Sequence, residues 1–434
     1  IGGSINLITR KAAGTRTSVT VGRGDNTLDQ AGKIVQLSGM HSNRSEDNNF
    51  GYMFNFSFYD NWTGSDNVEA EWDDEGNIVE HDIRKYLVHR ERKSLGLRFD
   101  YNLGNTELYT DLNYNDRDDY ENRYRQRIKD LDEGEGSQEI RRQTKAGLPG
   151  NEYGRLEDQK LFSYKFGGTS LLDKLKLDYS FKISEASELR PNERYLALRL
   201  KKQTAVWNQS TEKPNFTFSN AIAADLNNSW DFRNLIEERR DTDEKARSFK
   251  VDADYNFSDN LKIEAGLKIS TRKKERRNEF YEFEPVDEDA FLADAFSNIV
   301  SQNKSEWLND GDGTSYNSGS YVSREFVGNL DLSNTALFER VVVEEELAGN
   351  FKASEDITSF YGMATYDYSD RLLIVGGLRL ERTSLYDLEA RSYDEDNDVN
   401  NVISASDNDY TDVLPSLHMI YDLDGVSKLS LIHI

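Results

Sequence analysis

The feature that most constrains this chain is a strict alternation of apolar and polar side chains over residues 248–271. Apolar residues occupy every second position from 249 to 257 and again from 261 to 269, and the positions between them are mostly charged or polar. A period of two separates side chains onto opposite faces only in an extended strand. Residues 258–260, Ser-Asp-Asn, are turn formers. The segment is therefore predicted to be a β-hairpin with one apolar and one polar face.

The same alternation recurs along most of the chain, in about thirteen arms. Short turns rich in Asn, Asp, Ser and Gly alternate with long polar segments, which cover roughly 60–90, 115–158, 187–245, 272–356 and 386–409. In an antiparallel meander this order collects the short turns at one end and the long loops at the other, as in outer-membrane barrels. Arms of roughly 9 to 11 residues also suit a tilted strand that crosses a bilayer. The alternative is a soluble all-β protein whose sheet has one solvent-exposed face. In that case the long polar segments would cover the many apolar strand faces poorly.

Composition narrows the choice of protein class. The 434 residues carry a formal charge of -25, which disfavours a nucleic-acid partner. There is no cysteine, and therefore no disulfide framework and no cysteine nucleophile. No apolar run approaches the ~18 residues of a membrane helix, and a closed sheet is the other structure that pairs every backbone group in lipid. The predicted fold class is an all-β, antiparallel, up-and-down transmembrane barrel with long outer loops and short periplasmic turns.

Three segments carry motifs that point to one protein family. The first is IGGSINLITRKA at residues 1–12, which resembles the strand that closes the plug of the TonB-dependent outer-membrane receptors just before the barrel. The segment 351–383 resembles a barrel hairpin with a Gly-apolar-Arg-apolar-Glu core, and YTDVLPSLHMIYDL at 410–423 resembles a descending strand with a Leu-Pro-Ser-Leu motif. The order of the three segments, with barrel-length arms between them, strengthens the resemblance.

The resemblance implies a barrel of the 22-strand class with a plugged lumen. Residues 1–13 are then expected to be the C-terminal remnant of the plug, and 14–434 a partial barrel that is truncated at its C-terminus. The last residues, LIHI at 431–434, depart from the alternation. The signal peptide, most of the plug and the motif that engages TonB are expected upstream, and the remaining strands downstream.

The family also implies a function. We expect a receptor in the outer membrane of a Gram-negative bacterium that takes up a scarce nutrient when the TonB complex acts on its missing N-terminal region. A siderophore, cobalamin, an oligosaccharide and a peptide all remain open as the nutrient. Outer-membrane lipid is the other expected partner, and no nucleic acid is expected. A passive porin and, further behind, a soluble carbohydrate-binding protein are the alternatives.

The sequence predicts no enzyme, cofactor or metal site, because no catalytic constellation stands out and the five histidines lack ligand spacing. The candidate ligand-binding residues lie in the long segments and are Trp72, Trp207, Trp230 and Trp307. Large aromatic anchors concentrate at binding surfaces, although packing between loops is the favoured alternative for most of them. Trp62 is expected in an interfacial girdle. Basic residues where strands meet long segments would attract anionic headgroups or pair with neighbouring carboxylates.

The resemblance finally orients the hairpin. Its turn at 258–260 should lie at the periplasmic rim and the basic run 272–277 at the outer one. Alternate apolar residues should then face lipid: Phe249, Val251, Leu261, Ile263, Leu267 and Ile269. The charges on the other face should line the lumen: Lys250, Asp252, Glu264 and Lys268.

Overall fold

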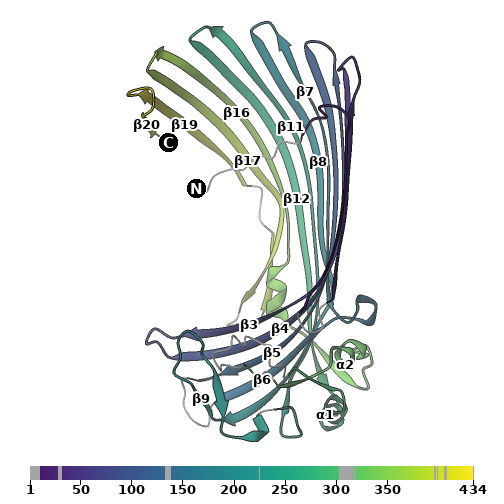
Figure 1. The fold of residues 1–434 in the computed structure, drawn as a ribbon. Coiled ribbons are helices and arrows are strands. Elements are labelled where there is room, and N and C mark those ends of the chain that lie inside the picture. Colours follow the sequence, from purple (N-terminus) through teal and green to yellow (C-terminus); the bar gives the residue numbers. More distant parts are fainter. Residues whose placement is uncertain are drawn as a thin grey trace.

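The protein is one tall, strongly curved antiparallel sheet whose concave side is open (Figure 1). The computed structural model describes residues 10–27, 32–131, 138–223, 225–302, 316, 319–394, 397, 399–404 and 408–433. Within those ranges no helix is both long enough and apolar enough to cross a membrane. The sheet has 16 strands, and its path runs from β1 at one edge to β20 at the other.

Thirteen strands lie on the main path of the sheet, and each pairs with the next strand along that path. From one edge to the other they are β1 (Arg16–Asp25), β2 (Lys33–Arg44), β3 (Phe50–Trp72), β4 (Ile78–Asn102), β5 (Thr106–Lys129), β6 (Gln138–Ala146), β8 (Leu175–Gln203), β11 (Asp231–Ser258), β12 (Leu261–Pro285), β16 (Phe351–Ser369), β17 (Leu372–Asp394), β19 (Asn408–Asp422) and β20 (Lys428–His433). Three more strands join it from the side: β7 (Arg155–Leu172), β15 (Phe338–Val342) and β18 (Val399–Ser404). The number of path strands agrees with the roughly thirteen arms predicted from alternation, but β6 falls in the segment 115–158, which is predicted to be a long loop.

Smaller elements occupy the long links between strands. They are η1 (Pro149–Asn151), β9 (Ala205–Trp207), β10 (Phe216–Phe218), η2 (Ala221–Ala223), α1 (Glu288–Ser297), β13 (Ile299–Ser301), β14 (Ser320–Val322), α2 (Arg324–Asn329) and η3 (Glu344–Gly349). Strands β9 and β10 form one small sheet, and β13 and β14 form another. Among them β9, α1 and α2 lie at the end of the sheet opposite the short turns (Figure 1).

The predicted hairpin is confirmed as β11 and β12. Phe249 pairs with Ile269 and Val251 with Leu267, so the apolar positions of the two arms lie opposite each other. The row continues onto β8, where Phe181 is the partner of Phe249. These side chains remain exposed, Phe249 by 43%, on the convex face of the sheet. The sequence pattern therefore specified both the register and the face of each side chain.

The strands extend further than the alternation predicts. The segments 60–90 and 115–130, expected in long loops, continue β3, β4 and β5, and β3 and β4 reach 23 and 25 residues. Away from the short turns, charged residues occupy both faces, so the apolar signal for a strand disappears. The backbone hydrogen bonds between strands do not depend on that signal. Long loops nevertheless remain at this end, between β8 and β11 and between β12 and β16.

Strands β6 and β7 share one position in the sheet. Near the short turns β7 lies between β5 and β8, and beyond residue 154 in the direction of the long loops β6 takes the same place. The turn that joins them holds two non-glycine residues in the left-handed region, Glu152 and Tyr153, both with φ of 56°. The side-chain amide of Asn122 donates to the Tyr153 carbonyl and anchors this turn to β5.

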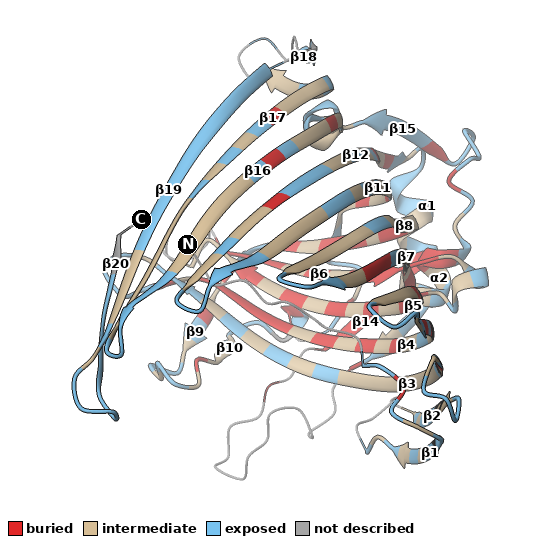
Figure 2. Ribbon diagram, turned by 90° about the horizontal axis from the view of Figure 1, so that it is seen from above, coloured by how far each residue is buried: buried red, intermediate tan, exposed pale blue. Residues whose placement is uncertain are grey.

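The hydrophobic core lies where the long loops cover the convex face of the extended strands. Residues of β6, β8 and β11, among them Ile140, Leu196 and Leu235, pack against Trp230 and Val327 from the loops. Buried positions accordingly gather at this end of the sheet (Figure 2). Arg142 on β6 is among the charged side chains buried in the same layer. Its guanidinium donates to two loop carbonyls, those of Ser320 and Ala223, and burial lowers its pKa.

The concave face holds the described end of the N-terminal segment. The Arg44 guanidinium donates to the Ala12 carbonyl at 2.6 Å, and the Ser42 hydroxyl donates to the Gly14 carbonyl at 3.2 Å. Lys11 also forms an ion pair with Glu107. Residues 1–9, which contain most of the plug-like motif, lie outside the described residues.

Candidate functional site

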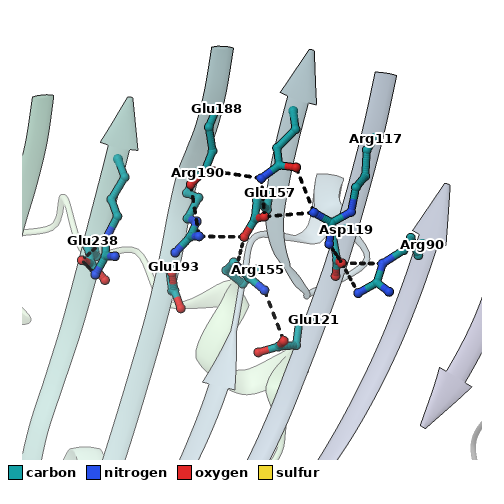
Figure 3. Close-up of polar contacts among 12 residues, drawn as sticks. Arg90, Arg117, Asp119, Glu121, Arg155, Glu157, Glu188, Arg190, Glu193 and Glu238 are labelled. Carbon is teal, nitrogen blue, oxygen red and sulfur yellow. Dashed lines mark hydrogen bonds and ion pairs between the residues drawn. The ribbon is translucent and has the colours of Figure 1, made fainter. Parts of the chain in front are cut away.

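A continuous network of charged side chains covers the concave face of β4, β5, β7 and β8 (Figure 3). The Asp119 carboxylate accepts hydrogen bonds from Arg90 and Arg117, both at 2.6 Å. Glu157 forms ion pairs with Arg155 at 2.6 Å and with Arg190 at 2.8 Å. Strand register brings these residues together, since Arg90 pairs with Asp119 and Asp119 with Glu157 on adjacent strands. Each charge is therefore held by a rigid strand and by its neighbours.

The deepest part of this network surrounds Glu193 on β8, which is 2% exposed. Lys145 lies 2.7 Å from Glu193 and 2.8 Å from Glu121. Burial acts to raise the pKa of Glu193, but the charge and hydrogen bond of Lys145, the Tyr195 hydroxyl and the Arg155 charge outweigh it and hold this pKa at about 2. The same burial and the Glu193 charge raise the pKa of the Tyr195 phenol. Glu193 therefore stays ionised and links β8 to Lys145 on β6.

Further towards the long loops the concave face becomes rich in arginine. We call this region the arginine patch, and it consists of Arg84, Arg123, Arg125, Arg127, Arg141 and Arg199. Arg127 pairs with Arg141 and Arg141 with Arg199 across three adjacent strands, and Arg84 is opposite Arg125. Like charges directly opposite each other destabilise a sheet. An arrangement that costs folding free energy in a chain of charge -25 points to a function of these cations.

Carboxylates only partly neutralise the arginine patch. Asp82 accepts from Arg127 at 2.9 Å and also from Arg84, but the nearest Arg125 nitrogen lies 4.0 Å from Asp82. Burial, together with the like charges of Arg123 and Arg127, lowers the pKa of Arg125 to about 10. Among the described residues no carboxylate forms an ion pair with Arg199. The patch can therefore accept negative charge from a ligand.

The concave face of the sheet also contains a groove of about 590 Å³, which lies on the side of the network towards the short turns. Its lining carries small polar side chains, among them Ser57, Ser94, Asn115, Ser187 and Thr242. Arg117 and Glu188 border this groove and also belong to the network above it. The concave surface is thus polar from this groove to the long loops.

The four predicted tryptophans occupy different surroundings. Trp72, at the end of β3, is 39% exposed and packs edge-to-face on Trp207 of β9, with ring centroids 5.7 Å apart. Trp230 is 1% exposed, donates to the Asp225 carbonyl and lies 5.2 Å from the Arg142 guanidinium. Its indole is covered by protein, as the loop-packing alternative expects. Trp307 lies outside the described residues.

Two further sequence expectations concern the rim of the barrel. Trp62 lies within β3 and not past its end, and its ring stacks on His89 at 4.0 Å. Arg90 and Arg117 face the concave side and pair with carboxylates. Arg382 likewise pairs with Asp409 at 2.8 Å. Ion pairing, one of the two predicted roles of the basic residues, is thus present at these positions.

A comparison with protein-family models assigns the chain. The model described as "TonB dependent receptor-like, beta-barrel" matches residues 180–430, more than half of the chain. The chain belongs to the TonB-dependent receptor family. A search of curated proteins gave no match.

Several solved outer-membrane proteins are similar to this receptor at low identity. The outer membrane protease OmpT from Escherichia coli is 10% identical over 87% of this chain and 97% of that chain, with a TM-score of 0.21. The copper transporter OprC is 11% identical over 98% and 62%, with a TM-score of 0.27. The ferric enterobactin receptor from Pseudomonas aeruginosa, in complex with enterobactin, is 10% identical over 99% and 77%, with a TM-score of 0.22.

Family membership confirms the predicted fold and location. The receptor is an outer-membrane protein of a Gram-negative bacterium, and its family consists of TonB-dependent transporters. The apolar convex face meets lipid, and the short turns lie at the periplasmic rim. The charged network and the arginine patch then line the outer part of the lumen. Sequence analysis missed both sites, because their residues are neighbours only through strand register.

Proposed function

We propose that this receptor imports an anionic nutrient, of the siderophore class, in a TonB-dependent step. The observation that carries the proposal is the arginine patch. Arginine presents a planar fork of donors that matches carboxylate, phosphate and catecholate oxygens in pairs. Among the described residues Arg123 and Arg199 form no ion pair with a carboxylate, and Arg125 forms only one, at 4.0 Å. All three are held on strands that face the lumen.

The rigidity of the patch supports a binding role. Strand pairing and ion pairs fix Arg84, Arg127 and Arg141 before any ligand arrives, so a ligand would not have to order them. A charged hydrogen bond contributes about 1.5–3 kcal/mol. Removal of one such contact should therefore weaken binding by at least roughly tenfold.

An oligosaccharide is the second candidate nutrient, and the Trp72–Trp207 pair favours it. Indole faces stack on the apolar faces of sugars, and Trp72 stays exposed at the tip of the β3–β4 hairpin. Trp207 adds its ring edge to the same surface. Cobalamin and a peptide are supported by no contact of this kind among the described residues.

We also propose that residues 1–13 are the end of a plug domain and residues 14–434 a part of the barrel. The hydrogen bonds from Arg44 and Ser42 to the segment at 12–14 support this, because they hold it on the lumenal face. The TonB complex would act through a region upstream. Extending the reading frame in both directions tests this proposal directly. An upstream region with no plug would favour the passive porin instead.

Uptake by cells that carry the full-length receptor tests the function. The double variant R125Q and R199Q should reduce binding of an anionic ferric tris-catecholate by at least roughly tenfold. The matched control K250Q and K268Q, which removes two charges low on the same face, should change binding less than twofold. Loss of uptake only in the W72A and W207A variant, with a neutral oligosaccharide as the probe, would instead support the second candidate. Uptake that persists without TonB would contradict active transport.

A further inference from the structure

A second polar cluster lies on the opposite, convex face of the sheet. It contains Asp60 on β3 and His89 and Glu91 on β4, and one ligand atom of each lies within 4.8 Å of the others. The His89 Nε2 atom is 2.9 Å from Asp60 Oδ1 and 4.0 Å from Glu91 Oε1. In the sequence these residues are up to 31 positions apart, and the β3–β4 register brings them together, since Asp60 pairs directly with Glu91.

The imidazole of His89 is fixed on every side. Its ring stacks between Trp62 at 4.0 Å and Tyr120 at 5.4 Å, with interplanar angles of 11° and 17°. Its Nδ1 atom lies 3.0 Å from the Glu152 carboxylate. His89 is only 7% exposed. A carboxylate that accepts from Nδ1 leaves Nε2 as the ligand atom, which is the usual arrangement around a metal-bound histidine.

The space between His89 Nε2 and Asp60 can hold a proton or a metal ion. Two lone pairs, one on nitrogen and one on a carboxylate oxygen, repel each other at 2.9 Å unless a proton or a metal ion lies between them. Ligands about 2.0–2.1 Å from a tetrahedral zinc ion lie roughly 3.3 Å apart. The distances of 2.9 and 4.0 Å bracket that value, so small side-chain rotations would complete the site.

The neighbouring charges are compatible with an ion. Lys93 pairs with Glu91 through Oε2 at 2.9 Å, which leaves the Oε1 atom towards His89. Asp60 and Glu91 are each 28% exposed, so an ion can reach them from solvent. One nitrogen and two oxygen ligands suit a divalent transition metal such as Zn²⁺. Three protein ligands also leave a coordination position for water.

We propose that Asp60, His89 and Glu91 bind a divalent transition-metal ion on the outer surface of the barrel. Glu152 is a positioning residue, which orients the imidazole from the turn between β6 and β7. The ion would connect β3, β4 and this turn on the convex face, just beyond the apolar residues that meet lipid. The site faces away from the lumen and is independent of the nutrient that the receptor imports.

Metal binding to the purified full-length receptor tests the proposal. Zn²⁺ titration by calorimetry and Co²⁺ titration by visible absorption should each reveal one saturable site per chain. H89Q and D60N should each weaken binding by at least roughly a hundredfold, and E152Q by about tenfold. Two different ligand variants guard against a folding defect in one of them, and an unchanged circular dichroism spectrum checks both.

A nearby acidic group provides the matched control. Asp116, Asp118 and Asp158 form a second cluster on the same face without a histidine. D116N should leave Zn²⁺ affinity and the Co²⁺ spectrum unchanged. Absence of saturable binding would overturn the proposal and would leave His89 as part of an ion-paired structural cluster. Binding lost in D116N but retained in H89Q would also overturn it.

Discussion

The burial of Arg142 leads to a prediction about the loops that cover the barrel. Its guanidinium donates to the Ser320 carbonyl at 2.8 Å, to Gln126 Oε1 at 3.1 Å and to the Ala223 carbonyl at 3.3 Å. It also lies over the Trp230 ring. One side chain of β6 thus connects the sheet to two separate loops, and we expect R142M to release both of them.

The size of the effect follows from these contacts. Methionine would leave the two loop carbonyls without their donor, at about 1–3 kcal/mol each. Loss of the cation–π contact adds about 1–2 kcal/mol. The variant no longer buries a charge, which offsets part of this cost. A net loss of roughly 3–5 kcal/mol in loop docking remains, which corresponds to opening that is at least a hundredfold more frequent.

Hydrogen exchange of the folded receptor measures that opening. Amides of residues 319–322, next to the Ser320 carbonyl that Arg142 holds, should exchange at least a hundred times faster in R142M. Amides of residues 327–330, which Arg194 holds through three carbonyls, and those of the strands near the short turns should change much less. R141M is the matched control, because Arg141 is the preceding residue and faces the lumen, where it pairs with Glu139. Equal protection of the loops in R142M and the wild type would refute the reasoning. Equal loss of protection in R141M would refute it as well.

Two further predictions concern the sheet itself. The pKa of Glu193 falls from its usual 4.5 to about 2, so its contribution to stability is complete above pH 4.5 and is lost as the pH falls towards 2. The shift corresponds to at most about 3 kcal/mol, and E193Q should flatten the acid-unfolding curve of the receptor in this range; an unchanged curve would contradict the assignment. On the convex face, L267K should lower the unfolding free energy in a lipid bilayer by about 2–4 kcal/mol. S270K adds the same charge on the lumenal face and should cost much less, and equal losses in denaturant titrations would mean that Leu267 does not meet lipid.

Near the short turns the amino-acid sequence determined the structure almost completely. The alternation over residues 249–269 predicted the hairpin, its turn and the face of each side chain, and β11 and β12 follow it. Such a pattern is readable because one face meets lipid and the other a polar lumen, and a slip of one residue would exchange the two. The motifs at 351–383 and 410–423 indicated the family for the same reason.

Only the tertiary structure decided which side chains are neighbours in the part of the sheet further from the short turns. Residues 60–90 lack a continuous apolar face, so an alternation of apolar and polar residues does not reveal their strands. Backbone pairing between β3 and β4 nevertheless continues as far as Trp72. Arg127, Arg141 and Arg199 come from three strands and become neighbours through register alone. His89 meets Asp60 across one strand pair and Glu152 across a turn more than sixty residues away. Local sequence dictates which way a side chain faces, whereas its neighbours on that face are set by how the strands align.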